Sequence, residues 1–183
     1  ILVKSIIKEM ELDDKTYKPG TVLGVISNAK NQLVTAEQYV ANPANRQADA
    51  RHNMTMMGQI FLRYCSRCRQ SDAMDFDDIL LYTYRLFEQH PDVLEKWEQR
   101  FRYVLVDEYQ DTNFAQHRIV WQLTKNHRHV CVVGDDAQSI YSFRGANIDN
   151  ILTFQKIYEG ARLFKLERNY RSTQNIVEAA NKI

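Results

Sequence analysis

The stretch VLVDEYQDT, Val104–Thr112, decides how the rest of the chain is interpreted. An apolar run with high strand propensity leads into two consecutive carboxylates, Asp107 and Glu108, and a third follows at Asp111. Carboxylates beside a buried strand are costly unless a cation, a partner or a reaction uses them. The stretch therefore predicts a β-strand that delivers Asp107 and Glu108 to a functional edge.

Strand-like and helix-like segments alternate around this stretch. The predicted strands are 101–107, 129–135 and 161–167, and the predicted helices between and after them are 113–125, 147–157 and 172–183. Short apolar runs separated by helices of about 12 residues indicate a parallel sheet covered by helices on both faces. The fold class that we predict for this part of the chain is α/β.

The chain before this part has a purely helical pattern. Apolar residues recur at spacings of three and four over the first 72 residues, and Thr35–Gln38 has the form of a capping box. One long helix is predicted from about residue 44 to 70, and two more over 75–90 and 91–100. We therefore divide the chain into a helical module, 1–72, and part of an α/β domain, 73–183.

Composition excludes some classes of protein and leaves others open. A content of 44% hydrophobic and 26% charged residues is typical of a globular protein, and the sequence has no apolar run of transmembrane length. Residues 1–100 carry a net charge of −1 and residues 101–183 a net charge of +2, so charge alone does not argue for nucleic-acid binding. Both ends of the sequence stop inside helical patterns, which indicates a piece of a longer protein.

The three cysteines are few and odd in number, which favours a reducing, cytoplasmic location. Cys65 and Cys68 form a single C-x-x-C motif on a helical pattern. Because no second Cys or His pair follows at zinc spacing, we expect these two residues to be structural and not metal ligands.

Two strand ends carry carboxylates at what should be the same edge of the sheet. The first ends at Asp107 and Glu108, and the second ends at 134–136, Gly-Asp-Asp. Ligands of open parallel sheets bind beyond the carboxyl ends of the strands. An Asp followed by a Glu has the form of a Walker B element, in which the Asp holds Mg²⁺ and the Glu activates water. The simpler alternative is that Asp107 caps a turn while Glu108 and Asp111 are solvated.

Two later stretches combine aromatic residues with arginine. In GDDAQSIYSFRGA, 134–146, Tyr141, Phe143 and Arg144 resemble a platform for single-stranded nucleic acid, although the aromatic residues could instead anchor the loop on the core. In LERNYRSTQNI, 166–176, an arginine before a helix N-terminus suits an anion and a tyrosine offers a flat face for a base. The alternative for Arg168 is a surface salt bridge to its neighbour Glu167.

The three stretches, in this order and spacing, resemble motifs II, III and IV of the UvrD/PcrA/Rep family of superfamily 1 DNA helicases. The resemblance extends to 18–39, 75–80 and 91–108, and so covers essentially the whole chain. It implies that the α/β part is a partial RecA-like sheet of the P-loop NTPase type. It also implies ATP and Mg²⁺ as cofactors, with single-stranded and duplex DNA as partners.

The resemblance assigns an ATP site to five residues. Asp107 would coordinate Mg²⁺ and Glu108 would activate the attacking water. Gln138 would sense the γ-phosphate and couple it to the DNA site. Tyr170 would stack on adenine and Arg171 would contact the γ-phosphate. Two further residues of the first motif, at positions 110 and 111, would tie its loop to neighbouring segments.

The resemblance also assigns a DNA site and two subdomains. Tyr141 and Phe143 would stack on bases, and Arg144 would bind the strand or link the two sites. Residues 1–72 would be most of the 1B insertion, which faces the duplex, and 73–183 the second half of the 1A domain. The implied activity is that of a 3′→5′ DNA helicase in repair or replication restart.

One departure from a working helicase is large. The sequence contains no G-x-x-x-x-G-K-[ST] loop to hold the β-phosphate, so we expect these 183 residues alone to be inactive, and marginally stable or self-associating because the sheet is incomplete. Three alternatives stay open. They are the helicase part of a recombination helicase–nuclease, a non-catalytic DNA-binding module, and a metal-dependent phosphohydrolase that uses Asp107, Glu108 and Asp135.

Overall fold

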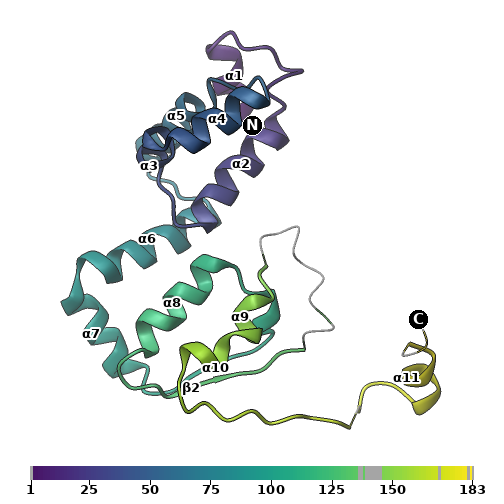
Figure 1. Ribbon diagram of the computed structural model, residues 1–183. Helices are drawn as coiled ribbons and strands as arrows, with labels where there is room; N and C mark the ends of the chain where they lie inside the picture. The colour runs from purple at the N-terminus through teal and green to yellow at the C-terminus, as the bar shows by residue number, and fades with distance from the viewer. Residues whose placement is uncertain (1, 136–137, 139–145, 169, 181, 183) are drawn as a thin grey trace. The chain divides into compact units, whose positions relative to one another are not determined.

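The computed structural model describes residues 2–135, 138, 146–168, 170–180 and 182 (Figure 1). The chain divides into two compact units, 1–152 and 153–183. The elements of the first unit are α1 (Leu2–Glu9), α2 (Pro19–Asn31), α3 (Ala36–Ala41), α4 (Pro43–Arg51), α5 (Met57–Gln70), α6 (Phe76–Gln89), α7 (Pro91–Arg100), β1 (Val104–Val106), the 3-10 turn η1 (Tyr109–Asp111), α8 (Phe114–Thr124), β2 (Val130–Val132) and α9 (Asp149–Leu152). The second unit contains α10 (Phe154–Ile157) and α11 (Gln174–Ala180). No helix of the described residues is long and apolar enough to cross a membrane.

Helices α1 to α5 enclose an apolar core of their own. Val22, Ile26, Met57, Ile60 and Phe61 are all completely buried in it. The core is closed by contacts of α1 with α2 and α5, and of α3 with α5. Burial of each large apolar side chain contributes roughly 1.5–3 kcal/mol, so this cluster is the main source of stability in the helical module.

The prediction of one long helix over 44–70 is wrong, because α4 and α5 are separate. Asn53 adopts a left-handed backbone, with φ of 56°, just after the end of α4. The Asn53 and Met54 amides donate to the carbonyls of Ala50 and Asp49, which is the Schellman pattern that terminates helices. Asn tolerates this conformation better than most residues, so the chain turns there and α5 starts afresh.

Capping boxes fix where three helices begin. Thr35 and Gln38 bond each other's backbone amides at the start of α3, so the capping box that we predicted there is confirmed. Asp75 with Asp78 does the same for α6, and Asn113 with Gln116 for α8. Each box satisfies two amides that a helix start leaves without partners, so these three starts are set by local sequence.

Strands β1 and β2 pair in parallel, as predicted, with Val104 opposite Val130 and Val106 opposite Val132. Helix α8 connects them and contacts α6 and α7 (Figure 1). One face of the pair is partly covered, but the other exposes Leu105 and Val133, 77% and 51% accessible. The described residues therefore form a mixed α/β fold around a two-stranded parallel sheet with one open apolar face.

Two other predictions for the α/β part are wrong. Residues 161–167 are extended but form no strand, since no described segment pairs with them and a strand needs a neighbour for its amides and carbonyls. Leu163, Phe164 and Leu166 are correspondingly exposed. The helix predicted over 147–157 is broken at Thr153 into α9 and α10, which belong to different units.

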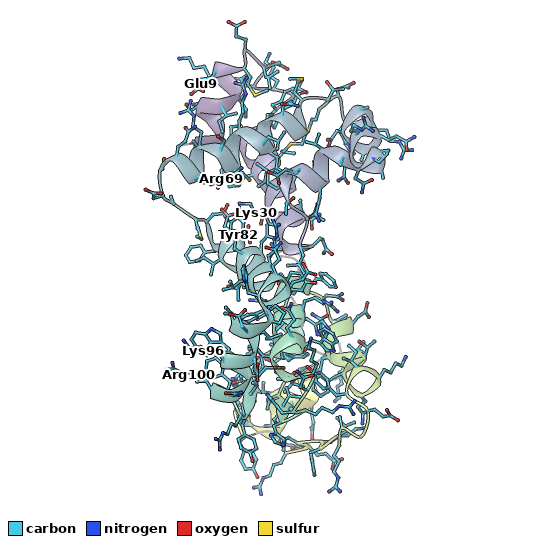
Figure 2. The ribbon with its side chains drawn as sticks, turned by 90° about the vertical axis from the view of Figure 1, so that its left-hand side faces the viewer. Glu9, Lys30, Arg69, Tyr82, Lys96 and Arg100 are labelled. Atoms are coloured by element: carbon cyan, nitrogen blue, oxygen red, sulfur yellow. The ribbon has the colours of Figure 1, made fainter. Side chains whose placement is uncertain are left out.

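A buried lysine joins the helical module to α6. Lys30, in the last turn of α2, is completely buried (labelled in Figure 2), and its ammonium lies 2.6 Å from Asp75 Oδ2 and 2.8 Å from Asp78 Oδ1. The Tyr64 hydroxyl donates to the same Asp75 oxygen at 2.8 Å, and its ring lies 4.8 Å from the ammonium. The C-terminus of α2, which favours a cation, thus meets the acidic N-terminus of α6.

The protonation equilibria of this cluster follow from its ion pairs. Burial alone would lower the pKa of Lys30, but hydrogen bonds and charges from Asp75 and Asp78 outweigh it, so the pKa of Lys30 is raised. Burial would raise the pKa of Asp75, but Lys30, the Asp78 amide and Tyr64 together lower it. The charged forms of Lys30 and Asp75 are therefore the stable ones in the folded chain.

Candidate functional site

The predicted carboxylates lie directly beyond the carboxyl end of β1. The strand ends at Val106, and Glu108 adopts a left-handed backbone with φ of 51° and ψ of 42°. Asp107 Oδ1 accepts a hydrogen bond from the Glu108 amide at 2.9 Å, which stabilises the sharp turn into η1. Both Asp107 and Glu108 are exposed, so both carboxylates are accessible to a ligand.

The loop after β1 is held against the end of β2 by an extension of the ladder. The Val133 amide donates to the Val106 carbonyl at 2.9 Å, and the Tyr109 amide donates to the Val133 carbonyl at 2.9 Å. The two carboxylate-bearing strand ends, at Glu108 and Asp135, are therefore neighbours at one edge. This juxtaposition is the one that the parallel-sheet prediction required.

Gln110 links the two strand ends through its side chain. It is 1% exposed, its Nε2 donates to Glu108 Oε2 at 2.8 Å, and its Oε1 accepts from the Asp135 amide at 3.1 Å. A buried amide with both ends occupied has one preferred orientation, so it fixes the direction of the Glu108 carboxylate. For Gln110, the expectation that the residue ties its loop to neighbouring segments is confirmed. Asp111, for which we expected the same, has a buried Oδ1 with no hydrogen-bond partner in the described structure.

Gln138 continues the same series of contacts. Its Nε2 donates to Asp135 Oδ2 at 2.7 Å and its backbone amide donates to the Asp135 carbonyl at 3.0 Å. The contacts therefore form a series. The Gln110 side chain joins the Glu108 carboxylate to the Asp135 backbone amide, and the Asp135 carboxylate in turn contacts the Gln138 side chain. Glu108 and Gln138, which we assigned to one ATP site, are therefore connected through Gln110 and Asp135.

Buried polar contacts, which sequence reasoning missed, support the loop 107–112 that follows β1 and is called the carboxylate loop below. Tyr109 is completely buried, and its hydroxyl lies 2.8 Å from His117 Nδ1. Burial, and to a lesser degree the nearby Arg118 charge, lower the pKa of His117, which favours the neutral imidazole. Asn150 Nδ2 donates to the carbonyl and hydroxyl of Thr112 at 3.0 and 3.2 Å. The signal available in the sequence was only the density of polar residues in 108–117.

The other predicted site residues lie outside the described part of the first unit. Tyr141, Phe143 and Arg144 lie outside the described residues. Tyr170 and Arg171 belong to the second unit, where Tyr170 is 85% exposed and the Arg168 guanidinium lies 5.1 Å from its ring centroid. The edge of the first unit therefore assembles the carboxylates and Gln138.

The donors at this edge suit a hard cation that is shared with a phosphate. Mg²⁺ in such sites keeps several waters and takes only one or two carboxylates from the protein. Asp107 is an exposed carboxylate of this type, and Asp135 lies beside the same loop. Among the described residues, no group of three or more His, Cys, Asp or Glu side chains is arranged to hold a metal ion.

The C-x-x-C cysteines are away from this edge. Cys65 and Cys68 are free thiols that pack against the core of the helical module. Burial raises the pKa of Cys65 to about 11, and burial also raises the pKa of Cys68. Because the thiolate is the reactive and metal-binding form, both residues have the character of structural cysteines.

Gly134 is expected to be essential for this arrangement. A Cβ at this position would lie 2.5 Å from Gln110 Oε1 and 2.7 Å from Ile151 Cδ1, and Gln110 cannot yield without losing a hydrogen bond. We expect Gly134→Ala to destabilise the chain by about 1–3 kcal/mol, as overpacking does. Urea unfolding followed by circular dichroism measures this change.

Gly24→Ala is the matched control for that substitution. Gly24 lies on the exposed side of α2, and a Cβ there meets nothing within 4 Å. The control should stabilise the chain by up to about 1 kcal/mol, because Ala is the better helix former. Equal effects of the two substitutions would show that Gln110 is not held in place as described.

Comparison with known proteins identifies the family of the chain. The model of the UvrD/REP helicase N-terminal domain matches residues 1–159. Over 182 residues, the chain is 44% identical to the ATP-dependent DNA helicase PcrA of Leuconostoc citreum and 42% identical to that of Bacillus subtilis. All of the chain is covered in both comparisons, but it spans only 24% of the length of these relatives. The chain therefore belongs to the UvrD/REP helicase family.

Proposed function

We propose that this chain is part of an ATP-driven 3′→5′ DNA helicase of repair or replication restart, and that it carries the catalytic carboxylate edge of the ATP site. The observation that supports this most directly is the series of contacts from Glu108 through Gln110 and Asp135 to Gln138. Relatives that are named ATP-dependent DNA helicases point to the same activity.

In this proposal each residue at the edge has one task. Asp107, exposed at the strand end, would hold Mg²⁺, which when bound neutralises charge on the phosphates. Glu108 would accept the proton of the attacking water, and Gln110 holds its carboxylate in one direction. Gln138, which donates to Asp135, would sense the γ-phosphate and couple it to the DNA site.

The DNA contacts and the rest of the ATP site belong to the remaining residues. Tyr141 and Phe143 would stack on single-stranded bases, with Arg144 on the strand, and base stacking of this kind contributes roughly 1–3 kcal/mol per base. Tyr170 would stack on adenine and Arg171 would contact the γ-phosphate.

We propose a subdomain assignment as well. Residues 1–72 would be most of the 1B subdomain and 73–183 the second half of a RecA-like 1A domain of the P-loop NTPase type. The exposed sheet face at Leu105 and Val133 supports our expectation that these 183 residues by themselves self-associate.

ATP hydrolysis measured in two proteins tests the proposed function. The complete protein, encoded by the reading frame that contains these residues, should show ATP hydrolysis stimulated by single-stranded DNA and should unwind a duplex with a 3′ overhang. The 183-residue chain should show neither activity, because it contains no loop of the G-x-x-x-x-G-K-[ST] form to hold the β-phosphate.

Each failure of that test has a definite meaning. Hydrolysis by the 183-residue chain alone would contradict the proposed division of the ATP site and favour a metal-dependent phosphohydrolase. DNA binding by the complete protein without any hydrolysis would instead favour a non-catalytic DNA-binding module.

A further inference from the structure

Asn31, the last residue of α2, contacts two other helices through one side-chain amide. It is 7% exposed, and its Nδ2 donates to Asp77 Oδ1 in the first turn of α6 at 3.1 Å. Its Oδ1 accepts from Asn113 Nδ2 at 2.8 Å, across 82 positions of sequence. Nδ2 also donates to Ser27 Oγ of α2 at 3.4 Å, so each end of the Asn31 amide has a partner from outside the helical module and one end has a further partner inside it.

Asn113 is itself fixed from several sides. Its Oδ1 caps α8 by accepting from the Gln116 amide at 2.9 Å, which leaves its Nδ2 to donate to Asn31. Its backbone forms a bridge with Ala146. Because the cap sets the plane of the Asn113 amide, the direction of its N–H groups is set as well, and Asn31 is the acceptor that lies there.

The position of Asn113 gives this contact its significance. Asn113 follows Thr112 at the end of the carboxylate loop, and the Thr112 carbonyl accepts from the amide of Asn147 at 3.0 Å. The segment 134–146, which contains the proposed DNA platform, ends at Ala146 beside it. The helical module, the carboxylate loop and the end of that segment thus meet at one asparagine.

We propose that Asn31 is a positioning residue through which the helical module fixes the carboxylate loop and the neighbouring Ala146 relative to itself. This inference rests on the proposed function, since it assigns the helical module a role in coupling ATP hydrolysis to strand separation. Asn31 acts through Asn113 and touches neither nucleotide nor DNA. A pair of amides in which each oxygen and each nitrogen has a partner defines one orientation, which the packing contact of α2 with α8 alone would not do.

The test measures base pairs unwound per ATP hydrolysed in the complete protein. We expect Asn31→Ala to lower this ratio by about 2- to 30-fold, the range that residues of a coupling network show, while ATP hydrolysis on single-stranded DNA stays within about twofold. Asn113→Ser should have the same effect, because serine caps α8 as well as asparagine does but has no N–H group to donate to Asn31.

Two combinations separate a positioning role from a merely structural one. Asn31→Ala with Asn113→Ser should be no worse than Asn31→Ala alone, since Asn31→Ala already removes the hydrogen bond that Asn113→Ser removes. Asn31→Asp alone should lower the ratio of base pairs unwound per ATP, because it places a carboxylate against Asp77. Asn31→Asp combined with Asp77→Asn exchanges donor and acceptor and should restore the ratio. Asn28→Ala, on an exposed position of α2, is the control and should leave the ratio unchanged.

The results that would overturn the inference are distinct from those that would overturn the proposed function. If the unsubstituted protein hydrolyses ATP and unwinds DNA, but Asn31→Ala and Asn113→Ser leave the ratio within about twofold or add to one another, the inference is wrong. If Asn31→Ala unfolds the protein, the inference is tested by Asn113→Ser and by the double variant Asn31→Asp with Asp77→Asn instead. If the unsubstituted protein shows no hydrolysis or unwinding, the proposed function itself is wrong, and the inference with it.

Discussion

Replacement of Glu108 by glutamine is expected to slow DNA-stimulated ATP hydrolysis by the complete protein by about 10²–10⁴-fold, the range for loss of a general base. Glutamine has nearly the same shape and keeps an oxygen that can accept from Gln110, so the loop should keep its geometry. It cannot accept the proton of the attacking water. The rate is measured at saturating ATP and single-stranded DNA, with binding of a fluorescent ATP analogue as the second readout.

Binding of the ATP analogue should change little in this variant, because Glu108 is assigned to the chemical step and not to affinity. Glu95→Gln is the control, since Glu95 is an exposed carboxylate on α7, and it should leave both quantities unchanged. If the rate of ATP hydrolysis falls by less than about tenfold in the Glu108 variant, Glu108 is not the general base. The alternative that Glu108 is only a solvated carboxylate would then be favoured.

Replacement of Lys30 by methionine is expected to lower the free energy of unfolding by about 3–5 kcal/mol, as loss of one partner of a buried ion pair does. Lys30 is completely buried between Asp75 and Asp78, and without its charge these two carboxylates repel each other at the start of α6. Urea unfolding of the purified chain, followed by circular dichroism, measures the loss. Lys8→Met, on the exposed side of α1, should change stability by no more than about 0.5 kcal/mol.

The charges of this cluster can be separated from its packing. Lys30→Met combined with Asp75→Asn and Asp78→Asn should recover most of the loss, because apolar and neutral groups of similar shape can replace a buried ion pair. Asparagine is also a good helix cap, so α6 should keep its start. If the triple variant is less stable than Lys30→Met alone, the capping role of the carboxylates outweighs their repulsion.

The pH dependence of the same variants has a definite sign. Because the pKa of Asp75 is lowered in the folded chain, its contribution to stability is fully present above its ordinary pKa and is lost as pH falls through the folded value. The pKa of Lys30 is raised, so its contribution is present below the ordinary lysine pKa and is lost as pH rises through the folded value. Lys30→Met should therefore reduce the acid sensitivity of the chain.

The local parts of the fold could be predicted from sequence. Strand propensity located β1 and β2, and the parallel arrangement followed from the helix between them. Capping chemistry placed the start of α3 at Thr35. In each case the residues that determine the structure are close in sequence, so a pattern can represent them.

Predictions failed where the outcome depended on a distant segment or on one backbone conformation. Residues 161–167 have strand composition, but a strand requires a neighbour, and composition does not provide one. The left-handed Asn53 ended α4 within a pattern that read as continuous helix. A single asparagine in a polar stretch gives little warning of this.

In the candidate site, too, the features that are local in sequence were predicted and those that depend on distant residues were not. Asp107 and Glu108 were predicted because a carboxylate pair after an apolar strand is a local signal. The partners that hold the site come from elsewhere: Asp135 is 25 positions from Gln110, and Asn31 is 82 positions from Asn113. Such pairings are properties of the folded arrangement, and one sequence alone does not contain a periodic signal for them.

The left-handed backbone of Glu108 indicates a conflict between folding and chemistry at this position. A residue with a Cβ is less stable in this conformation by roughly 1–2 kcal/mol, and glycine would adopt it with no such penalty. Stability of the fold alone would favour glycine at position 108, whereas the general-base role that we propose for this position requires glutamate. The packing and hydrogen bonds of the surrounding segments must therefore offset the unfavourable backbone conformation that keeps the Glu108 carboxylate in this position.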